Sequence, residues 1–484
     1  MHTQENQMRL LPKVDYLLNL EIFNKCNKTI LKPIICKHLE VLRTRIKTQH
    51  TDSIQESIQS LPHIIKLEYD SILAPSLVPV VNATGVVLQT NLGRSVFHST
   101  LIERIMPLLT RYNTLEYDLT KGERASRYMH ANALLKALFG EEYEFLLVNN
   151  NAAAVLLILQ TFGKDKEVII SRGELVEIGG GFRIPEVMKS AGCILCEVGA
   201  TNKTHLQDYE NAINENSAII MKAHQSNFSQ IGFCAQVSMQ EISALAQKNG
   251  LIDYYDVGSG FVGVEFKEVD SNFVENLHTS EPNLKEVFSL NPSLVSFSGD
   301  KLFGSAQVGI IAGKKELINT LKSNHLLRAL RVDKLCISIL QATLELYIKR
   351  ELDKIPTLAM LHSSLDSLQK RAQTFLATLN QSYLSDFNFT LLELDSVAGG
   401  GSLPDSTFKS YGIAMRAKNV SAAHLESCLR VEFYIITRVF KQLVVIDMRT
   451  LLKDDESRIL QALQAIQERL STQPTKPKNK KIAK

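Results

Sequence analysis

A lysine stands between two apolar runs in the segment from Val295 to Ile311. Lys301 comes three residues after Ser298, and glycines stand at positions 299 and 304. A lysine at a strand end faces a cleft, where loss of water lowers its pKa and favours formation of a Schiff base. Ser298 would offer a hydroxyl to a cofactor phosphate. The alternative is a surface lysine in a turn, and this segment alone leaves both interpretations open.

A carboxylate followed by glycines ends another apolar run, from Leu251 to Tyr255. Enzymes that use pyridoxal phosphate place a carboxylate at the carboxyl edge of a parallel sheet, where it keeps the pyridine nitrogen protonated. Asp256 has this position, one or two strands before Lys301. The pair predicts a pyridoxal phosphate site, in which Asp256 and Lys301 are the catalytic residues.

Asparagines join a third apolar run to a helical pattern at positions 149 to 151. The backbone N–H groups at a helix N-terminus bind phosphate, and small residues leave them accessible. We therefore expect Asn150, Asn151 and Ala152 to contact the cofactor. The alternative is a simple strand-to-helix cap.

Short apolar runs alternate with helix-length amphipathic segments after Pro79. This alternation indicates a mainly parallel sheet covered by helices on both faces. The order of the asparagines, Asp256 and Lys301 along it suggests an α/β fold of the aspartate-aminotransferase-like class (fold type I). The seven expected strands are 145–148, 167–171, 194–198, 218–222, 251–255, 294–297 and 308–312.

The chain is expected to divide into four parts. Residues 1–75 read as a module of short amphipathic helices, and the first fifty residues carry more Lys and Arg than Asp and Glu. That excess permits RNA contact, although a solvated helix face explains it equally well. Residues 76–340 would form the cofactor-binding domain, residues 341–470 a smaller α/β domain, and residues 471–484 a disordered lysine-rich tail.

Composition excludes several classes of protein. The 484 residues are 45% hydrophobic and 22% charged, which is typical of a globular chain with a large core. The run from Ala152 to Leu159 is far shorter than the roughly 20 residues of a membrane helix, so no membrane association is expected. Seven scattered cysteines and a polar start predict a cytoplasmic protein. Cys193 and Cys196 have metal-site spacing without a second ligand pair, so no metal is expected.

Longer motifs in the sequence indicate one particular family within this fold class. The chain resembles the bacterial selenocysteine synthases, the L-seryl-tRNA(Sec) selenium transferases. The matching motifs run from the N-terminal module into the C-terminal domain, and they are Arg9–Asp15, Asn82–Arg94, Asn149–Ala154, Ser171–Gly180, Ser226–Phe228, Asp256–Gly260, Ser298–Lys301, Arg328–Lys334 and Gly399–Pro404.

The resemblance implies a reaction and its participants. Lys301 would carry pyridoxal phosphate, and seryl-tRNA(Sec) would lose water from its serine to form an aminoacrylate. Selenium from selenophosphate would then add, giving selenocysteinyl-tRNA(Sec). The N-terminal module would bind the body of tRNA(Sec). The chain would form a homo-oligomer, a decameric ring built from dimers.

The resemblance also implies a cationic pocket for selenophosphate, at Arg94, Arg127, Arg328 and Arg331. Guanidinium groups bind tetrahedral oxyanions in a bidentate manner and stay charged at any working pH. Arg328 and Arg331 are three residues apart, so we expect both on one helical face.

Some positions depart from the family pattern. Gln89 stands where histidine is usual, Ala125 replaces a glycine, and residues 303–306 differ after Lys301. These departures leave two alternatives open: a pyridoxal phosphate lyase acting on a free amino acid or phosphorylated amino sugar, and a tRNA-binding homologue that has lost catalysis.

Overall fold

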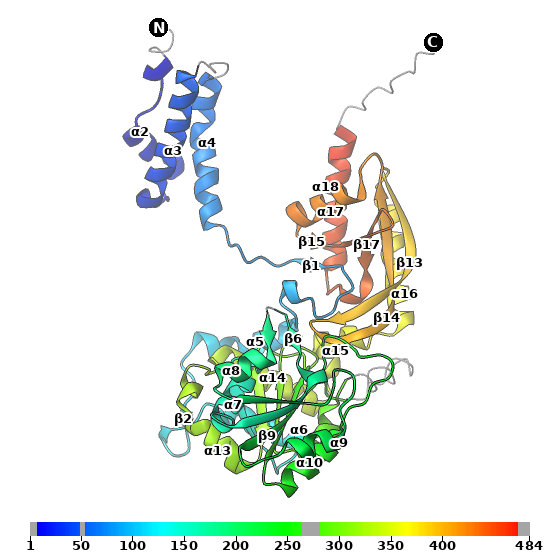
Figure 1. Ribbon diagram of the computed structural model, residues 1–484. Helices are drawn as coiled ribbons and strands as arrows, with labels where there is room; N and C mark the ends of the chain where they lie inside the picture. Colours follow the sequence, from blue (N-terminus) through cyan, green and yellow to red (C-terminus); the bar gives the residue numbers. More distant parts are fainter. Residues whose placement is uncertain (1–6, 49–53, 180, 264–280, 473–484) are drawn as a thin grey trace. The chain divides into compact units, whose positions relative to one another are not determined.

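The computed structural model describes residues 7–48, 54–179, 181–263 and 281–472. The chain divides into two compact units, Met1–Pro79 and Val80–Lys484 (Figure 1). Most of the expected C-terminal tail lies outside the described residues. Every helix in the described ranges is too short or too polar to cross a membrane.

The first unit is a bundle of helices around its own core. Its helices are α2 (Val14–Leu18), η1 (Glu21–Phe23), α3 (Lys28–Lys47) and α4 (Ile54–Leu73). Helix α3 begins where the Asn27 side chain accepts a hydrogen bond from the Thr29 N–H. Leu31 and Ile35 of α3 pack with Ile65 of α4 in this core. The expectation of short helices is wrong for α3 and α4, because their apolar stripes continue over 20 residues each.

Seven strands form the large sheet of the second unit, and all seven expected strands belong to it. The order is β4-β12-β11-β10-β9-β5-β8; β12 is antiparallel to both neighbours, whereas the other pairs are parallel. This arrangement confirms the expected fold class. The strands are β4 (Glu144–Val148), β5 (Glu167–Ser171), β8 (Ile194–Val198), β9 (Ser217–Ala223), β10 (Ile252–Gly258), β11 (Leu294–Ser298) and β12 (Gly309–Gly313).

Helices cover both faces of this sheet, because successive strand residues point to opposite sides. Ile220 of β9 faces a core with Leu340, and Ile219 and Met221 face a second core with Leu157. Helices α6 (Met129–Phe139), α10 (Met239–Lys248), α12 (Leu284–Ser289) and α14 (Lys334–Lys349) contribute to the first core. Helices α7 (Asn151–Phe162), α8 (Ile184–Ser190) and α13 (Lys315–Ser323) contribute to the second.

A smaller antiparallel sheet with the order β13-β14-β17-β16 follows in the chain. Its strands are β13 (Phe387–Gly399), β14 (Ser402–Ala417), β16 (Arg438–Phe440) and β17 (Leu443–Asp447). The helices α16 (Leu365–Gln381), α17 (Ala422–Phe433) and α18 (Asp455–Thr472) share a core with it. A short helix, α15 (Pro356–Leu361), precedes α16 in the chain and is separate from it. The Ser364 side chain starts the second helix by accepting from the Ser367 N–H.

The first strand of the second unit joins this smaller sheet region. Strand β1 (Val81–Asn82) pairs with β15 (Ile435–Ile436). Gly85 then passes the buried Asp447 with φ +76°, so closely that a Cβ on Gly85 would lie 2.1 Å from Asp447 Oδ2. Asp447 accepts hydrogen bonds from Ser396 Oγ at 2.8 Å and Ser410 Oγ at 2.7 Å. Moving the Asp447 carboxylate away from Gly85 would therefore break these two hydrogen bonds.

We predict that Gly85→Ala destabilises the second unit much more than Gly93→Ala. Both glycines have positive φ, but a Cβ on Gly93 would meet nothing within 4 Å. Gly93→Ala therefore carries backbone strain of about 1 kcal/mol, and Gly85→Ala adds a clash with a buried carboxylate, for a total of about 3 kcal/mol. Thermal and urea unfolding would measure the difference. Equal losses of unfolding free energy in the two variants would show that the Asp447 side chain moves aside without cost.

Candidate active site

Lys301 lies in the turn between β11 and β12, and it is only 5% exposed. The backbone of this turn is clamped by Ser95, whose Oγ lies 2.9 Å from the Asp300 carbonyl oxygen and 3.2 Å from that of Lys301. Burial lowers the pKa of the lysine amine, and nearby Asp256 opposes that shift. The turn thus holds the lysine in a fixed place, where burial disfavours the charged amine.

Asp256 lies near the carboxyl end of β10, beside β11, and it is buried. Burial raises the pKa of its carboxyl group; a hydrogen bond from Asn151 Nδ2 at 2.8 Å and the charge of Lys301 oppose the shift. Ser296 Oγ lies 3.4 Å from Asp256 Oδ1. Two side chains therefore orient the carboxylate. The structure brings the two predicted catalytic residues into one electrostatically coupled pair.

The asparagines at positions 150 and 151 have different roles: one caps a helix and the other positions Asp256. Asn150 caps helix α7, because its Oδ1 accepts from the Ala153 N–H at 2.8 Å. Asn151 instead holds Asp256, and Ala152 is exposed in the first turn of the helix. Gly309 of β12 lets the run approach, since a Cβ there would lie 2.2 Å from the Asn150 carbonyl oxygen. The cap interpretation is correct for Asn150, while the first-turn N–H groups remain suited to an anion.

Ser298 is the last residue of β11 and is buried. Residues two apart on a strand share a face, so Ser298 lies on the same face as Ser296, which contacts Asp256. The hydroxyl is therefore placed on the Asp256 side of the sheet.

Two histidine-centred contacts were not anticipated from the sequence. His224 directly follows β9, and its N–H donates to the Asp256 carbonyl oxygen at 2.9 Å. Its Nε2 lies 3.2 Å from Glu281 Oε2. Glu281 also accepts from Ser259 Oγ at 2.6 Å and from the Leu403 N–H at 2.7 Å. The strand-end position of His224 is a usable sequence signal, whereas nothing in the local pattern marks Glu281.

The residues fit pyridoxal phosphate. Asn151 Oδ1 is a buried polar atom without a hydrogen-bond partner among the described residues. Buried polar groups are normally paired, so such an atom on the side chain that holds Asp256 indicates room for a polar ligand beside that carboxylate. A desolvated lysine, a buried carboxylate and a helix N-terminus are the groups that this cofactor needs for its aldehyde, ring nitrogen and phosphate.

The four predicted arginines lie in two places. Arg94, with φ 61°, donates from Nη1 to Asp300 Oδ2 at 2.7 Å, next to Lys301. Its charge contributes to the lowered pKa of Lys301. The other three, Arg127, Arg328 and Arg331, line a separate cavity of about 540 Å³.

The three cavity arginines are not equally free. Arg127 donates from Nε to Glu116 Oε1 at 2.9 Å and from Nη1 to the Val332 carbonyl oxygen at 2.7 Å. Arg331 Nη1 lies 3.5 Å from the same Glu116 oxygen, while Arg328 forms no ion pair with any described carboxylate. The cavity therefore offers Arg328 and part of Arg331 to a ligand, and Arg127 is already engaged.

The expectation that Arg328 and Arg331 share a helical face is wrong. Arg328 ends the short helix η4 (His325–Arg328), and Arg331 forms an isolated bridge with Val148. The Asn149 N–H also bonds to the Leu330 carbonyl oxygen at 3.0 Å, so backbone pairing with the end of β4 replaces the helix. Both arginines still face the same cavity.

The departures from the family pattern are accommodated locally. Gln89 accepts from the Asn91 N–H at 3.4 Å and so starts the short helix η2 (Thr90–Leu92). Ala125 has no left-handed backbone angle, so a Cβ is tolerated there.

The departures after Lys301 lie in the interior. Phe303 is fully buried and packs on Tyr347 with 5.0 Å between ring centroids. Ala306 packs with Ile339 in a small core. The changes after Lys301 fill the interior and leave the turn intact.

Comparison with known proteins agrees with this geometry. A solved structure of D-glucosaminate-6-phosphate ammonia-lyase is similar in fold, with a TM-score of 0.54 and 18% identity over 84% of this chain and 99% of that one. An L-seryl-tRNA(Sec) selenium transferase of Helicobacter hepaticus is 50% identical over 95% of this chain and 98% of its own length. One of Wolinella succinogenes is 48% identical over 95% and 99%. The family model for L-seryl-tRNA selenium transferase matches residues 80–452. The chain therefore belongs to the L-seryl-tRNA selenium transferase family.

Proposed function

We propose that this chain converts L-seryl-tRNA(Sec) to L-selenocysteinyl-tRNA(Sec), with pyridoxal phosphate as its cofactor. The observation that carries the proposal is the pair of buried side chains, Lys301 and Asp256, at the carboxyl edge of the large sheet. The family match and relatives of the same name over nearly the whole chain support the substrate.

Each residue of the pair has a distinct task. Pyridoxal phosphate supplies, when bound, an electron-withdrawing ring that stabilises negative charge at the Cα of an amino acid. Asp256 would hold the proton of the ring nitrogen, and Asn151 keeps that carboxylate in place. Lys301 would hold the cofactor and then take the Cα proton of the seryl group. Both tasks need a neutral amine, which the lowered pKa of Lys301 favours.

Phosphate groups would be bound at two further places. Ser298 and the first-turn N–H groups at Asn151 and Ala152 are the proposed contacts of the cofactor phosphate. The proposed selenium donor is selenophosphate, bound by Arg328 and Arg331 in the 540 Å³ cavity.

The two remaining arginines of the proposed donor site have different surroundings. Arg127 would shape the cavity wall, since Glu116 and Val332 already hold it. Arg94 would place positive charge beside Lys301.

We also propose a cytoplasmic homo-oligomer built from dimers, as a decameric ring. Exposed apolar side chains on the second unit support contacts between copies. Tyr112, Ile231 and Phe233 are each at least 87% exposed, so their apolar surface is available for such contacts.

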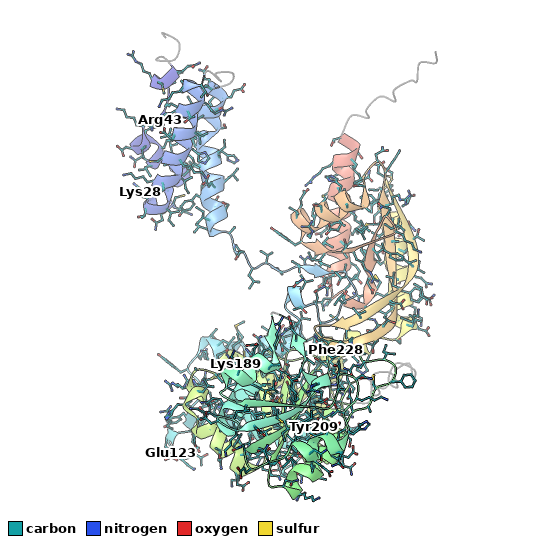
Figure 2. The ribbon with its side chains drawn as sticks, in the orientation of Figure 1. Lys28, Arg43, Glu123, Lys189, Tyr209 and Phe228 are labelled. Atoms are coloured by element: carbon teal, nitrogen blue, oxygen red, sulfur yellow. The ribbon has the colours of Figure 1, made fainter. Side chains whose placement is uncertain are left out.

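Residues 1–75 are proposed to bind the body of tRNA(Sec). Lys28 and Arg43 lie on the surface of this unit (Figure 2). Arg43 pairs with Glu40 and Lys37 with Glu68, but many cations of the unit have no ion pair with a described carboxylate. These unpaired cations can neutralise RNA phosphates, and they are Arg9, Lys13, Lys25, Lys28, Lys32, Arg45 and Lys47.

Lys301→Ala is expected to abolish the visible absorption of the bound cofactor and the formation of selenocysteinyl-tRNA(Sec), because it removes the only proposed attachment amine. Absorbance after gel filtration and product analysis on the tRNA would measure both. Lys315→Ala, at an exposed position of α13, is the matched control and should keep both properties. Borohydride fixation of the cofactor to the Lys301 variant would contradict the assignment.

Arg328→Ala and Arg331→Ala are expected to raise the selenophosphate concentration needed for half-maximal rate by about ten- to a hundredfold, since each removes a charge-assisted contact to the donor. Affinity for seryl-tRNA(Sec) should change little. Initial rates over a range of donor concentrations would measure the effect, with Arg111→Ala, an exposed arginine outside the cavity, as control. Donor saturation like that of the wild type in both variants would move the donor site elsewhere.

A variant that starts at Val80 should keep the cofactor absorption but lose affinity for tRNA(Sec) by about tenfold or more. The reason is that Asp256 and Lys301 lie in the second unit, whereas the first unit would supply phosphate contacts. Filter binding at two salt concentrations would also show a smaller salt dependence. Equal affinity of full-length and shortened protein would favour the alternative of a lyase acting on a small molecule.

A further inference from the structure

One carboxylate lies among the cations of the proposed donor cavity. Glu116 is the only acidic residue in the described lining, which also holds several positive side chains. Its Oε1 accepts from Arg127 and lies 3.5 Å from Arg331 Nη1, and its Oε2 lies 3.3 Å from Arg124 Nη2. The positive side chains of the lining are Arg124, Arg127, Lys322, Arg328 and Arg331.

Glu116 stays ionised and partly open to the cavity. The hydrogen bond from Arg127 lowers the pKa of its carboxyl group. The Glu116 side chain is 29% exposed, and the partner of Oε2, Arg124, is 77% exposed. Oε2 therefore keeps acceptor capacity toward the cavity, because each carboxylate oxygen has two lone pairs.

The backbone fixes this carboxylate in position. Glu116 precedes the hairpin of β2 (Tyr117–Asp118) and β3 (Glu123–Arg124), and its carbonyl oxygen accepts from the Ala125 N–H at 3.1 Å. Arg124 ends this hairpin, and Glu116 and Arg127 flank it in the chain. A fixed carboxylate in a cationic anion site repels any bound anion unless that anion offers it a proton.

We propose that Glu116 is a specificity-determining residue, which makes the cavity select tetrahedral oxyanions that carry a hydroxyl proton over fully deprotonated ones. A phosphorus oxyanion with a P–O–H group donates a hydrogen bond to Glu116 while its other oxygens bind Arg328 and Arg331. Sulfate at neutral pH has no proton to donate and meets repulsion. This inference rests on the proposed donor site.

Titration calorimetry of the cofactor-loaded enzyme with inorganic phosphate and with sulfate, at pH 7 and constant ionic strength, tests the proposal. The wild type should bind phosphate about tenfold more tightly than sulfate, the value of one hydrogen bond to a charged group. Glu116→Gln should remove this preference, because the amide donates to sulfate and no longer repels it. An unchanged ratio of the two affinities in Glu116→Gln would overturn the proposal.

Further variants separate the possible failures. Glu116→Asp keeps the charge, so it should retain a preference for phosphate; loss of the preference with Asp as with Gln would mean that the hairpin has merely been disturbed and would overturn the proposal. Glu123→Gln removes an exposed carboxylate outside the lining and should keep the wild-type ratio. A shift as large as that of Glu116→Gln would assign selectivity to net charge instead. If Arg328→Ala leaves both affinities unchanged while Glu116→Gln alters their ratio, the donor site is misplaced and the role of Glu116 stands.

Discussion

Burial of two ionisable groups beside each other is the constraint on which the rest of the site depends. Lys301 and Asp256 are removed from water, which disfavours the charged form of each, and only their neighbours offset that cost. Asn151, at the start of α7, bonds to the Asp256 carboxylate, and Ser95, before α5 (Ser99–Thr110), holds the backbone of the lysine turn. The parallel sheet makes this possible, since it brings the carboxyl ends of several strands to one edge.

The sequence predicts best where a pattern has one physical cause. Strands buried on both faces must be continuously apolar, so all seven strands of the large sheet could be found. Their ends marked Asp256, which directly follows one strand, and Lys301, which lies in the turn after another. The roles of the arginines were harder to predict, because residue type does not tell whether a guanidinium group already bonds to another protein group. Arg127 is held by Glu116, and no spacing rule relates these two residues to Val332. Glu281 was out of reach for the same reason, since its partners His224, Ser259 and Leu403 meet only in the folded chain.

The arginines have two kinds of surroundings: Arg94 pairs with Asp300 in the lysine turn, and Arg328 lies in the separate cavity. Arg94 has an aspartate partner in the lysine turn, so it tunes the field around Lys301 as well as offering charge. The cavity around Arg328 has an excess of positive charge that its single carboxylate does not cancel. Charge that is not neutralised within the protein raises the local concentration of anions, and it does so most at low ionic strength. In the proposed function, Arg94 would act on the lysine turn and Arg328 would bind the anion.

The pairing of β1 with β15 has a consequence for the order of events during synthesis. The Gly85 N–H bonds to Thr450 Oγ1 across 365 positions, and Val81 pairs with Ile435. A ribosome adds about 5 to 20 residues per second, so the start of the second unit waits roughly 20 to 70 seconds for its partners. During that time the segment around Gly85 has no place to dock, and the Ser95 clamp on the lysine turn lacks the anchored strand before it. The segment that leads into Ser95 can therefore be anchored only after nearly the whole chain has been made.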